Sequence, residues 1–516
     1  MSWIQRHADA ITVGVLFFLL LHLLVVFPRL INHDVGVFLE LGYRLIDGER
    51  LYVDYEENDF PAIHYISAVP TAIAKALDIS PYLPFVSLIW LGSLASILYS
   101  GHQARRLGVP QAAAFIQIAM TIYTVLFYLD FTWGQREHIF LILYMPWLIM
   151  RLIRYQGGKV VPITALLIGL GAGLGVSIKP YFTVIAVLPE LYLLLSTRQF
   201  RQIIRWEILG VALVAIAHVL YFALQPEVWA AFQQMTQRLL AGYGAFGSPS
   251  LVELLILCLL YAGRAWGVLF VLTPFLGWLF FRRWRTNLST TTFAFAYAAL
   301  GAMLALFLQG KGWGYHSLPF TGLSSVLMAW MLPFILTSLR VAISYPLRIG
   351  IVVIVLFIAG RQYIDAISKI VKIDQFSYSL SGIIENYSKV GDWVMFVDDG
   401  LAPAYPMLIT MRRHNASRYA MTVIPVAYYQ YKEPPHTEIN PIVPAYAQEY
   451  LDNFVKDLEL HQPPLIFIRS DRVWSMSENI TDYHQYLIAR GVIDTAVLPY
   501  YDLLIVQDNF HIYLRR

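Results

Sequence analysis

Long apolar stretches recur through the first 360 residues of this chain, and they constrain its fold more than any other feature. A helix needs about 20 mostly apolar residues to cross a bilayer. Only 14% of the residues are charged and 58% are hydrophobic, which agrees with a membrane environment. The sequence therefore predicts a polytopic α-helical membrane protein with about eleven transmembrane helices. These expected spans lie at residues 11–27, 82–100, 112–129, 137–152, 160–178, 181–195, 206–224, 265–281, 291–308, 318–339 and 345–358.

Basic residues predict the orientation, because positively charged loops stay on the cytoplasmic side. Arg6 precedes the first apolar stretch, which has no cleavage site after it and is interpreted as a retained anchor. The later clusters fall in every second loop, at Arg105/Arg106, Arg151/Arg154/Lys159, Arg198/Arg201/Arg205, Arg282/Arg283/Arg285 and Arg340/Arg348. These loops are expected to be cytoplasmic. The alternate loops and everything after about residue 360 then face the outside or a lumen.

Two further apolar stretches, 61–77 and 251–261, are expected to lie on the outer membrane surface rather than to cross it. The first carries His64, Pro70 and Lys75, and the second is too short. Counting either as a span would place the later arginine clusters on the wrong side.

The tail changes character, because its apolar residues come in short bursts: "DWVMFVDD", "PPLIFIRS", "DLLIVQD" and "FHIYLRR". A helix is expected at 445–460. The pattern is typical of a small α/β domain. The predicted organisation is therefore a membrane domain over 1–360, with 31–81 as its first outer loop, and an extracytoplasmic α/β domain over 361–516.

The first outer loop, "NHDVGVFLELGYRLIDGERLYVDYEENDFPAIHY", holds an unusual number of carboxylates. An amphipathic surface helix is expected from Asp34 to Gly48, with Glu40 and Arg44 paired four residues apart on its polar side. Asp34 has two interpretations, as the cap of this helix, in competition with Asn32, or as a functional carboxylate.

Ionisable residues also gather at the edges of other spans. In "LDFTWGQREHIF", Arg136, Glu137 and His138 start a span, where charge is costly unless it faces a polar cavity or the interface. The pair Arg136 and Glu137 has the alternative of simply anchoring the helix end. Lys179, in "SIKPYF", either snorkels outward or serves a site.

A third outer segment, "QGKGWGYHSLPF", places Lys311, Tyr315 and His316 at the same predicted face. An interfacial Trp/Lys belt is the alternative. Carboxylates and cations at one lipid surface suit sugar transfer from a lipid phosphate, because cations hold the leaving phosphate and a carboxylate deprotonates the acceptor hydroxyl.

The first outer loop resembles that of the GT-C class of polyprenyl-phosphate-dependent membrane glycosyltransferases, in the branch of protein O-mannosyltransferases and aminoarabinose transferases. Asp34, Phe38, "DGERLYVD" ending at Asp54, and "NDFPAIHY" take the places of that branch's acidic residue, aromatic helix, turn and surface-helix entry. Pro61 alone replaces the usual double proline. Glu137 matches the acidic start of the fourth span, and "GKGWGYHSLP" resembles the loop near the lipid phosphate.

The resemblance implies a role for each matched residue. Asp34 would be the general base of an inverting transfer, and Glu137 would orient the acceptor or help hold a cation. Arg136, Lys179, Lys311 and His316 would contact the donor phosphate. Further substrate contacts are expected from His138, Tyr315, Asp54 and His64. No obligatory metal is predicted, although some members of the class use a divalent cation.

The expected partners are a polyprenyl-phosphate-linked sugar, membrane lipids, and a glycolipid, polysaccharide or protein acceptor, in a bacterial inner or plasma membrane. Nucleic acid is not expected, because the net charge is only +3 and the basic residues lie in short loops. A lipid or sugar transporter or flippase, a receptor or scaffold, and an inactive homologue remain alternatives. "GLGAGLG", residues 169–175, is interpreted as a helix-packing face rather than a dinucleotide loop, because it lies inside a span.

Overall fold

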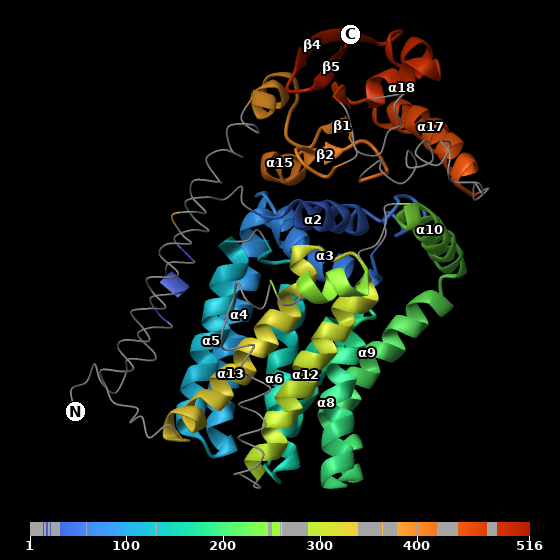
Figure 1. Cartoon of the computed structure of the whole chain (residues 1–516). Coiled ribbons are helices and arrows are strands. Elements are labelled where there is room, and N and C mark those ends of the chain that lie inside the picture. The colour runs from blue at the N-terminus through green and yellow to red at the C-terminus, as the bar shows by residue number, and fades with distance from the viewer. Residues whose placement is uncertain are drawn as a thin grey trace. The chain divides into compact units, whose positions relative to one another are not determined.

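The computed structural model describes residues 31–57, 59–129, 132–245, 250–257, 287–338, 379–398, 400–420, 442–471 and 482–516, with isolated positions at 14, 17, 18, 21, 260 and 364. Its contacts divide the chain into two compact units, coloured by residue number in Figure 1. Unit 1 comprises Met1–Pro28, Val86–Tyr221 and Ser248–Ile367. Unit 2 comprises Arg29–Phe85, Phe222–Gly247 and Ser368–Arg516.

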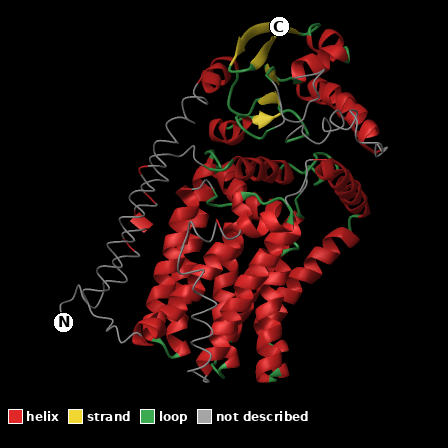
Figure 2. Cartoon of the chain, in the orientation of Figure 1, coloured by secondary structure: helices red, strands yellow, loops and turns green. Residues whose placement is uncertain are grey.

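In its described residues unit 1 contains helices joined by loops and turns and no strand, as Figure 2 shows. Its long helices are α4 (Tyr82–Ala104), α5 (Pro110–Leu129), α6 (Arg136–Tyr155), α7 (Pro162–Ile178), α8 (Phe182–Thr197), α9 (Trp206–Ala223), α12 (Asn287–Gln309) and α13 (Leu318–Ser338). Short 3-10 turns lie at η1 (Arg105–Leu107), η2 (Phe200–Ile203) and η3 (Gly314–Ser317). Helix α12 packs against α8 and α13, α13 against α5, and α6 against α7.

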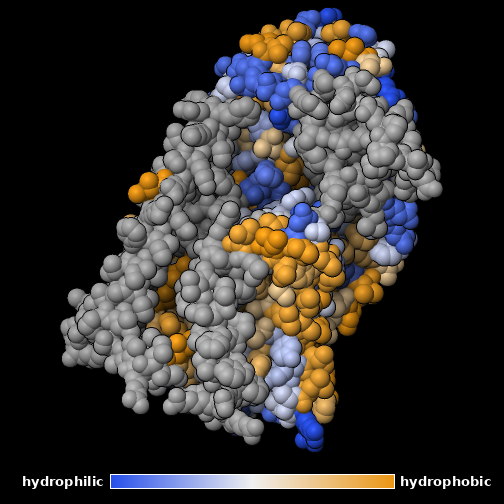
Figure 3. Space-filling view, viewed as in Figure 1, coloured by the Kyte–Doolittle hydropathy of each residue, from blue (hydrophilic) through white to orange (hydrophobic). Residues whose placement is uncertain are grey.

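Within the described residues, five helices are long and apolar enough to cross a membrane. Hydrophobic side chains gather on the surface of the bundle in Figure 3, and exposed Leu213, Ile216 and Val219 show the same on α9. Apolar surface of this extent suits lipid rather than water. The chain is therefore a multi-pass integral membrane protein, as the sequence predicts.

Every expected span that falls within the described residues coincides with a helix, and the ends differ by a few residues. The expected spans at 11–27, 265–281 and 345–358 lie outside the described residues except for single positions. Residues 61–77 form a helix, α3 (Pro61–Leu77), and residues 251–257 are helical; their place on the membrane surface stays a prediction.

Glycine allows α7 and α9 to approach closely. A Cβ added to Gly169 would lie 2.1 Å from the carbonyl oxygen of Glu207, and one added to Gly210 would lie 2.6 Å from that of Leu166. Small residues at such a crossing let two backbones touch. The interpretation of "GLGAGLG" as a helix-packing face is confirmed.

Arg151 and Arg154 correct the expectation that the basic residues of this region occupy a loop. Both lie in the last turns of α6 and are buried. Arg151 donates to Glu190 of α8 and to Glu207 of α9, the latter at 2.8 Å, and Arg154 also donates to Glu207. Carboxylates from two other helices neutralise these guanidinium groups, so the two arginine side chains can be buried without hydration by water.

Unit 2 contains α2 (His33–Ile46), α3 and α10 (Pro226–Ala245) together with the C-terminal α/β residues. Helix α2 begins at the Asn32 cap, whose side chain accepts from the backbone N–H of Asp34 at 2.8 Å. Asn32 rather than Asp34 is therefore the N-cap of this helix. Helix α10 was not expected from the sequence.

The C-terminal part of unit 2 is a five-stranded mixed sheet in the order β2-β1-β3-β5-β4. The strands are β1 (Trp393–Val397), β2 (His414–Asn415), β3 (Leu465–Arg469), β4 (Tyr501–Gln507) and β5 (Phe510–Arg515). β1 pairs in parallel with β2 and β3, and β5 is antiparallel to β3 and β4. Helices α15 (Ala404–Met411), α17 (Ile442–His461) and α18 (Tyr483–Ala489) complete it. The four expected strands and the helix at 445–460 are confirmed.

The polar side of α2 packs on this domain. Glu40 and Arg44 form the expected pair at 3.8 Å, but both are buried. Arg44 donates to the carbonyl oxygens of Asn415 and Ser417, and Glu40 accepts from the Asn415 backbone and approaches His414 at 3.3 Å. Burial alone would lower the pKa of His414, but the Glu40 carboxylate holds it above its usual value.

Candidate active site

Two helix ends place opposite charges side by side in unit 1. Glu137 occupies the first turn of α6, where the helix dipole favours a carboxylate. Lys179 is the C-terminal cap of α7, where the dipole favours a cation. The Lys179 ammonium donates to Oε1 of Glu137 at 2.5 Å, and the two side chains are only 8% and 0% exposed.

Residues from the third outer segment surround this pair. Lys179 also donates to Oε1 of Gln309, the last residue of α12, at 3.1 Å, and its ammonium lies 5.2 Å from the centre of the Tyr315 ring. The guanidinium of Arg136 lies 5.9 Å from the same ring. His316, which is buried, packs its ring edge-on against Tyr315 at 4.5 Å.

One oxygen of the Glu137 carboxylate is an open acceptor within this cluster. Oε2 of Glu137 is buried and makes no hydrogen bond with any residue that the structure describes. Such an atom costs free energy unless a ligand or water satisfies it. A carboxylate with one oxygen fixed by Lys179 and the other open is suited to accept a hydroxyl proton or to hold a cation.

Two further predicted residues, His138 and Lys311, lie in the same segments of the sequence. His138 is fully buried, accepts from the Gly134 backbone at 3.0 Å through Nδ1, and lies against the Trp133 ring. Lys311 follows α12 in the loop that leads to Tyr315, and partial burial lowers the pKa of its ammonium.

Three of the residues predicted for the site, Asp34, Asp54 and His64, belong to unit 2. The Asp34 side chain is 13% exposed and lies 3.3 Å from Nε2 of His33. Asp54 pairs with Arg50 at 3.0 Å, and this hydrogen bond lowers the pKa of the Asp54 carboxyl. His64 is fully buried and packs edge-on against Phe38. Asp54 thus closes a turn, and His64 joins α3 to α2.

Gln309 is the residue of the cluster that sequence reasoning missed. It is polar, ends a long apolar helix, and stands two positions before Lys311. The sequence signal that could have identified it is a polar amide side chain at the end of a predicted membrane span. Within the described ranges, no three His, Cys, Asp or Glu side chains lie together as metal ligands would.

A bundle of apolar helices together with a mixed-sheet domain at the C-terminus is the fold of the GT-C membrane glycosyltransferases, and this chain has that fold. The particular structures it matches include ArnT from Cupriavidus metallidurans bound to undecaprenyl phosphate. That match has 12% identity and a TM-score of 0.62, and it covers 99% of this chain and 98% of ArnT. The apo form of the same ArnT matches with a TM-score of 0.60 at 13% identity, over 98% of each chain.

A second class member extends the comparison. The oligosaccharyltransferase of Archaeoglobus fulgidus, tethered to an acceptor peptide, matches with a TM-score of 0.54 at 12% identity, over 97% of this chain and 73% of that protein. No protein-family model matches the sequence, and no curated protein matches it either. The resemblance stated from the sequence is therefore confirmed by the fold, which is that of glycosyltransferases using lipid-linked sugars.

Proposed function

We propose that the protein is an inverting glycosyltransferase that moves a sugar from a polyprenyl-phosphate donor to an acceptor hydroxyl at the outer face of the membrane. The observation that carries this proposal is the buried pair of Lys179 and Glu137 beside Arg136, Tyr315 and His316. Buried ion pairs are expensive to form, and they are therefore weak as stabilising devices. Ionisable groups at the ends of membrane-spanning helices are costly unless they face a polar site.

The chemistry assigns each group a role. Lys179 and Arg136 supply the positive charge that a leaving lipid phosphate needs, and an enzyme using this leaving group needs no strong acid. Glu137, with its open oxygen, orients the acceptor or helps to hold a cation. Asp34 remains the proposed general base by its place in the family pattern. Lys311, His138, Asp54 and His64 stay predicted substrate contacts.

The transporter alternative lacks a supporting observation among the described residues. Transport sites usually place ionisable groups near the bilayer midplane on interrupted helices. Here Glu137 starts α6, Lys179 ends α7, and Gln309 ends α12.

The test uses membranes containing the native protein and a labelled panel of polyprenyl-phosphate sugars. The native protein is expected to transfer label from one donor, and Asp34→Asn is expected to lose transfer by about a hundredfold or more, as for loss of a general base. Asp47→Asn, which changes an exposed carboxylate at the end of the same helix, is the matched control. Equal incorporation by native protein and Asp34→Asn removes Asp34 from the mechanism. Donor binding without transfer under every condition favours the flippase.

A further inference from the structure

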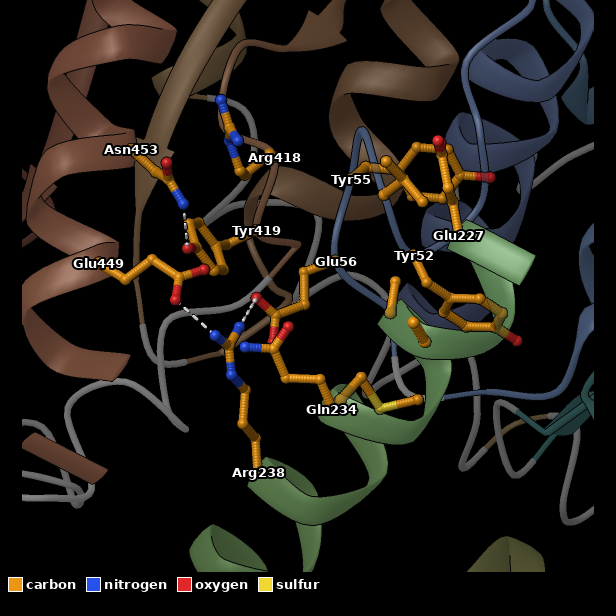
Figure 4. Close-up of a pocket in the computed structure, with 14 residues that line it drawn as sticks. Tyr52, Tyr55, Glu56, Glu227, Gln234, Arg238, Arg418, Tyr419, Glu449 and Asn453 are labelled. Carbon is orange, nitrogen blue, oxygen red and sulfur yellow. Dashed lines mark hydrogen bonds and ion pairs between the residues drawn. The ribbon is translucent and has the colours of Figure 1, made fainter. Parts of the chain in front are cut away.

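A polar pocket lies wholly within unit 2 and shares no lining residue with the Lys179 cluster. It has a volume of about 480 Å³ and is lined by three segments: the first outer loop around Tyr52–Glu56, one face of α10, and C-terminal residues including Arg418 and Asn453. Pockets that bind small molecules have volumes of about 300–1,000 Å³. Figure 4 shows Gln234, Arg238 and Glu56 side by side in it.

The walls are held rigid by a chain of polar contacts. Tyr446 donates to Glu56, whose other oxygen lies 3.7 Å from the Arg238 guanidinium. Arg238 also donates to Glu449 of α17 and lies 4.3 Å above the Tyr446 ring. These contacts fix α10 against α17, so the polar groups are positioned before any ligand arrives, which reduces the entropy cost of binding.

The loop wall carries backbone strain. Tyr52 has a φ of 68°, in the left-handed region that a bulky residue rarely adopts, and its hydroxyl donates to the Asp59 carbonyl oxygen. Strain of this kind costs about 1–3 kcal/mol and gathers at ligand sites. The conformation directs the Tyr52 ring toward Phe232 of α10, 5.1 Å away, at the edge of the pocket.

The charges of the pocket disfavour an anion as its ligand. Three carboxylates line it, from Glu56, Glu227 and Glu449, against the guanidinium groups of Arg238 and Arg418. Both guanidinium groups are engaged: Arg238 by Glu56 and Glu449, and Arg418 by Asp457 at 2.8 Å. A phosphate would meet repulsion without an available cation.

Hydroxyl groups suit these walls much better. Carboxylates accept from hydroxyls, and the amides of Gln234 and Asn453 both donate and accept. Tyrosine rings at the edge supply apolar area for the C–H face of a sugar ring. We propose that this pocket binds neutral or amino sugars of the acceptor, which makes the acceptor a glycan or glycolipid. The inference deepens the proposed sugar transfer and rests on it.

Position 234 gives a sharp test, because Gln234 is an exposed residue of α10 that faces the pocket, whereas its exposed neighbour Gln233 does not line it. Full-length protein in nanodiscs is exposed to a panel of neutral and amino disaccharides, with inorganic phosphate as the anion probe. Saturation-transfer NMR measures binding. Gln234→Trp fills the pocket and is expected to weaken saccharide binding at least tenfold, and Gln233→Trp is expected to leave it unchanged.

Three results overturn the inference: no saccharide of the panel binds the native protein, binding survives Gln234→Trp, or phosphate competes for the pocket. If Gln234→Trp does not fold, Gln234→Ala decides instead. This smaller change is expected to weaken binding about threefold, and unchanged binding overturns the inference.

The transfer assay separates this inference from the proposed function. Gln234→Trp is expected to raise the KM for acceptor about tenfold and to leave the KM for donor unchanged, and a raised donor KM alone overturns the acceptor assignment. Transfer by a native protein that binds no saccharide refutes only the pocket. Saccharide binding by a native protein that transfers no sugar from any donor refutes the proposed function instead.

Discussion

The ammonium nitrogen of Lys179 lies 2.5 Å from Oε1 of Glu137, joining the C-terminal end of α7 to the N-terminal end of α6. The pair is nearly inaccessible to solvent. Two charges held this way lose their hydration, and only good geometry repays that cost. The proposed site for a charged ligand gives a reason for placing so costly a pair beside Arg136 and Tyr315.

Removal of one member of this pair is expected to destabilise the protein. Lys179→Met leaves the Glu137 carboxylate buried without its cation and should lower the free energy of unfolding by about 3–5 kcal/mol. The double variant Glu137→Gln/Lys179→Met should recover part of this loss, because it removes both charges. Denaturant unfolding in detergent micelles measures the free energy of unfolding of both variants.

Lys75→Met is the control, because it changes a lysine that is 54% exposed. Its free energy of unfolding should stay within about 0.5 kcal/mol of that of the native protein. A double variant less stable than Lys179→Met would contradict the pairing.

Arg136→Gln is expected to weaken donor binding. Its guanidinium is buried near Tyr315, and a hydrogen bond from a charged group to a phosphate contributes about 1.5–3 kcal/mol. The KM for the lipid-phosphate sugar should therefore rise about tenfold to a hundredfold. Steady-state transfer kinetics measure it. Arg106→Gln, at an exposed arginine of η1, provides the control. An unchanged donor KM in Arg136→Gln would assign this residue to anchoring the helix end.

The spans were predictable because a bilayer demands about 20 apolar residues in sequence, and that requirement is local. The strands β1 and β3 were predictable for a similar reason, because a buried strand is a short apolar run between turns. Helix α10 was missed, since its sequence mixes polar and apolar residues and its position is fixed by Arg238 contacting Glu449 of α17. Such long-range contacts leave no local pattern.

In the candidate site, too, the residues could be predicted from local sequence but their contacts could not. Arg136, Glu137 and Lys179 were recognisable, because charges at span edges are exceptional. That Lys179 contacts Glu137 and Gln309 follows from the packing of α6 with α7 and from the place where α12 ends. The partners of Arg151 were likewise hidden, because Glu190 and Glu207 come from two later helices. The catalytic roles assigned by resemblance remain predictions.

Two glycines of "GLGAGLG" should differ in their tolerance of alanine. The added methyl group of Gly169→Ala would lie 2.1 Å from the Glu207 carbonyl oxygen, a backbone atom that cannot move aside. That of Gly171→Ala would meet only Cδ2 of Leu143, at an ordinary 3.6 Å. Gly169→Ala should therefore destabilise the protein by about 1–3 kcal/mol, as overpacking does, and Gly171→Ala should be close to native. Thermal unfolding followed by size-exclusion chromatography measures the midpoint of unfolding of each variant. Equal midpoints would show that α7 and α9 do not cross at Gly169.

Glu56 should make stability depend on pH near neutrality. Burial raises the pKa of this carboxyl from 4.5 to about 7, against the opposing effects of Tyr446 and Arg238. The folded protein then holds this proton more tightly than the unfolded chain does. The resulting stabilisation is complete below pH 4.5 and is lost as the pH rises through 7. Glu56→Gln should flatten the decline of the thermal midpoint over that range.

A second variant tests the sign of this pH effect. The hydroxyl of Tyr446 donates to Glu56 and lowers its pKa, so Tyr446→Phe should raise that pKa and extend the decline in stability to higher pH. The other charged groups near Glu56 are Arg238, Glu449 and Arg418, and both variants keep them. Scanning calorimetry from pH 5 to 8 compares the three proteins. The assignment fails if Glu56→Gln keeps the native slope or if Tyr446→Phe shifts the decline to lower pH, because either result would give the titration to another group.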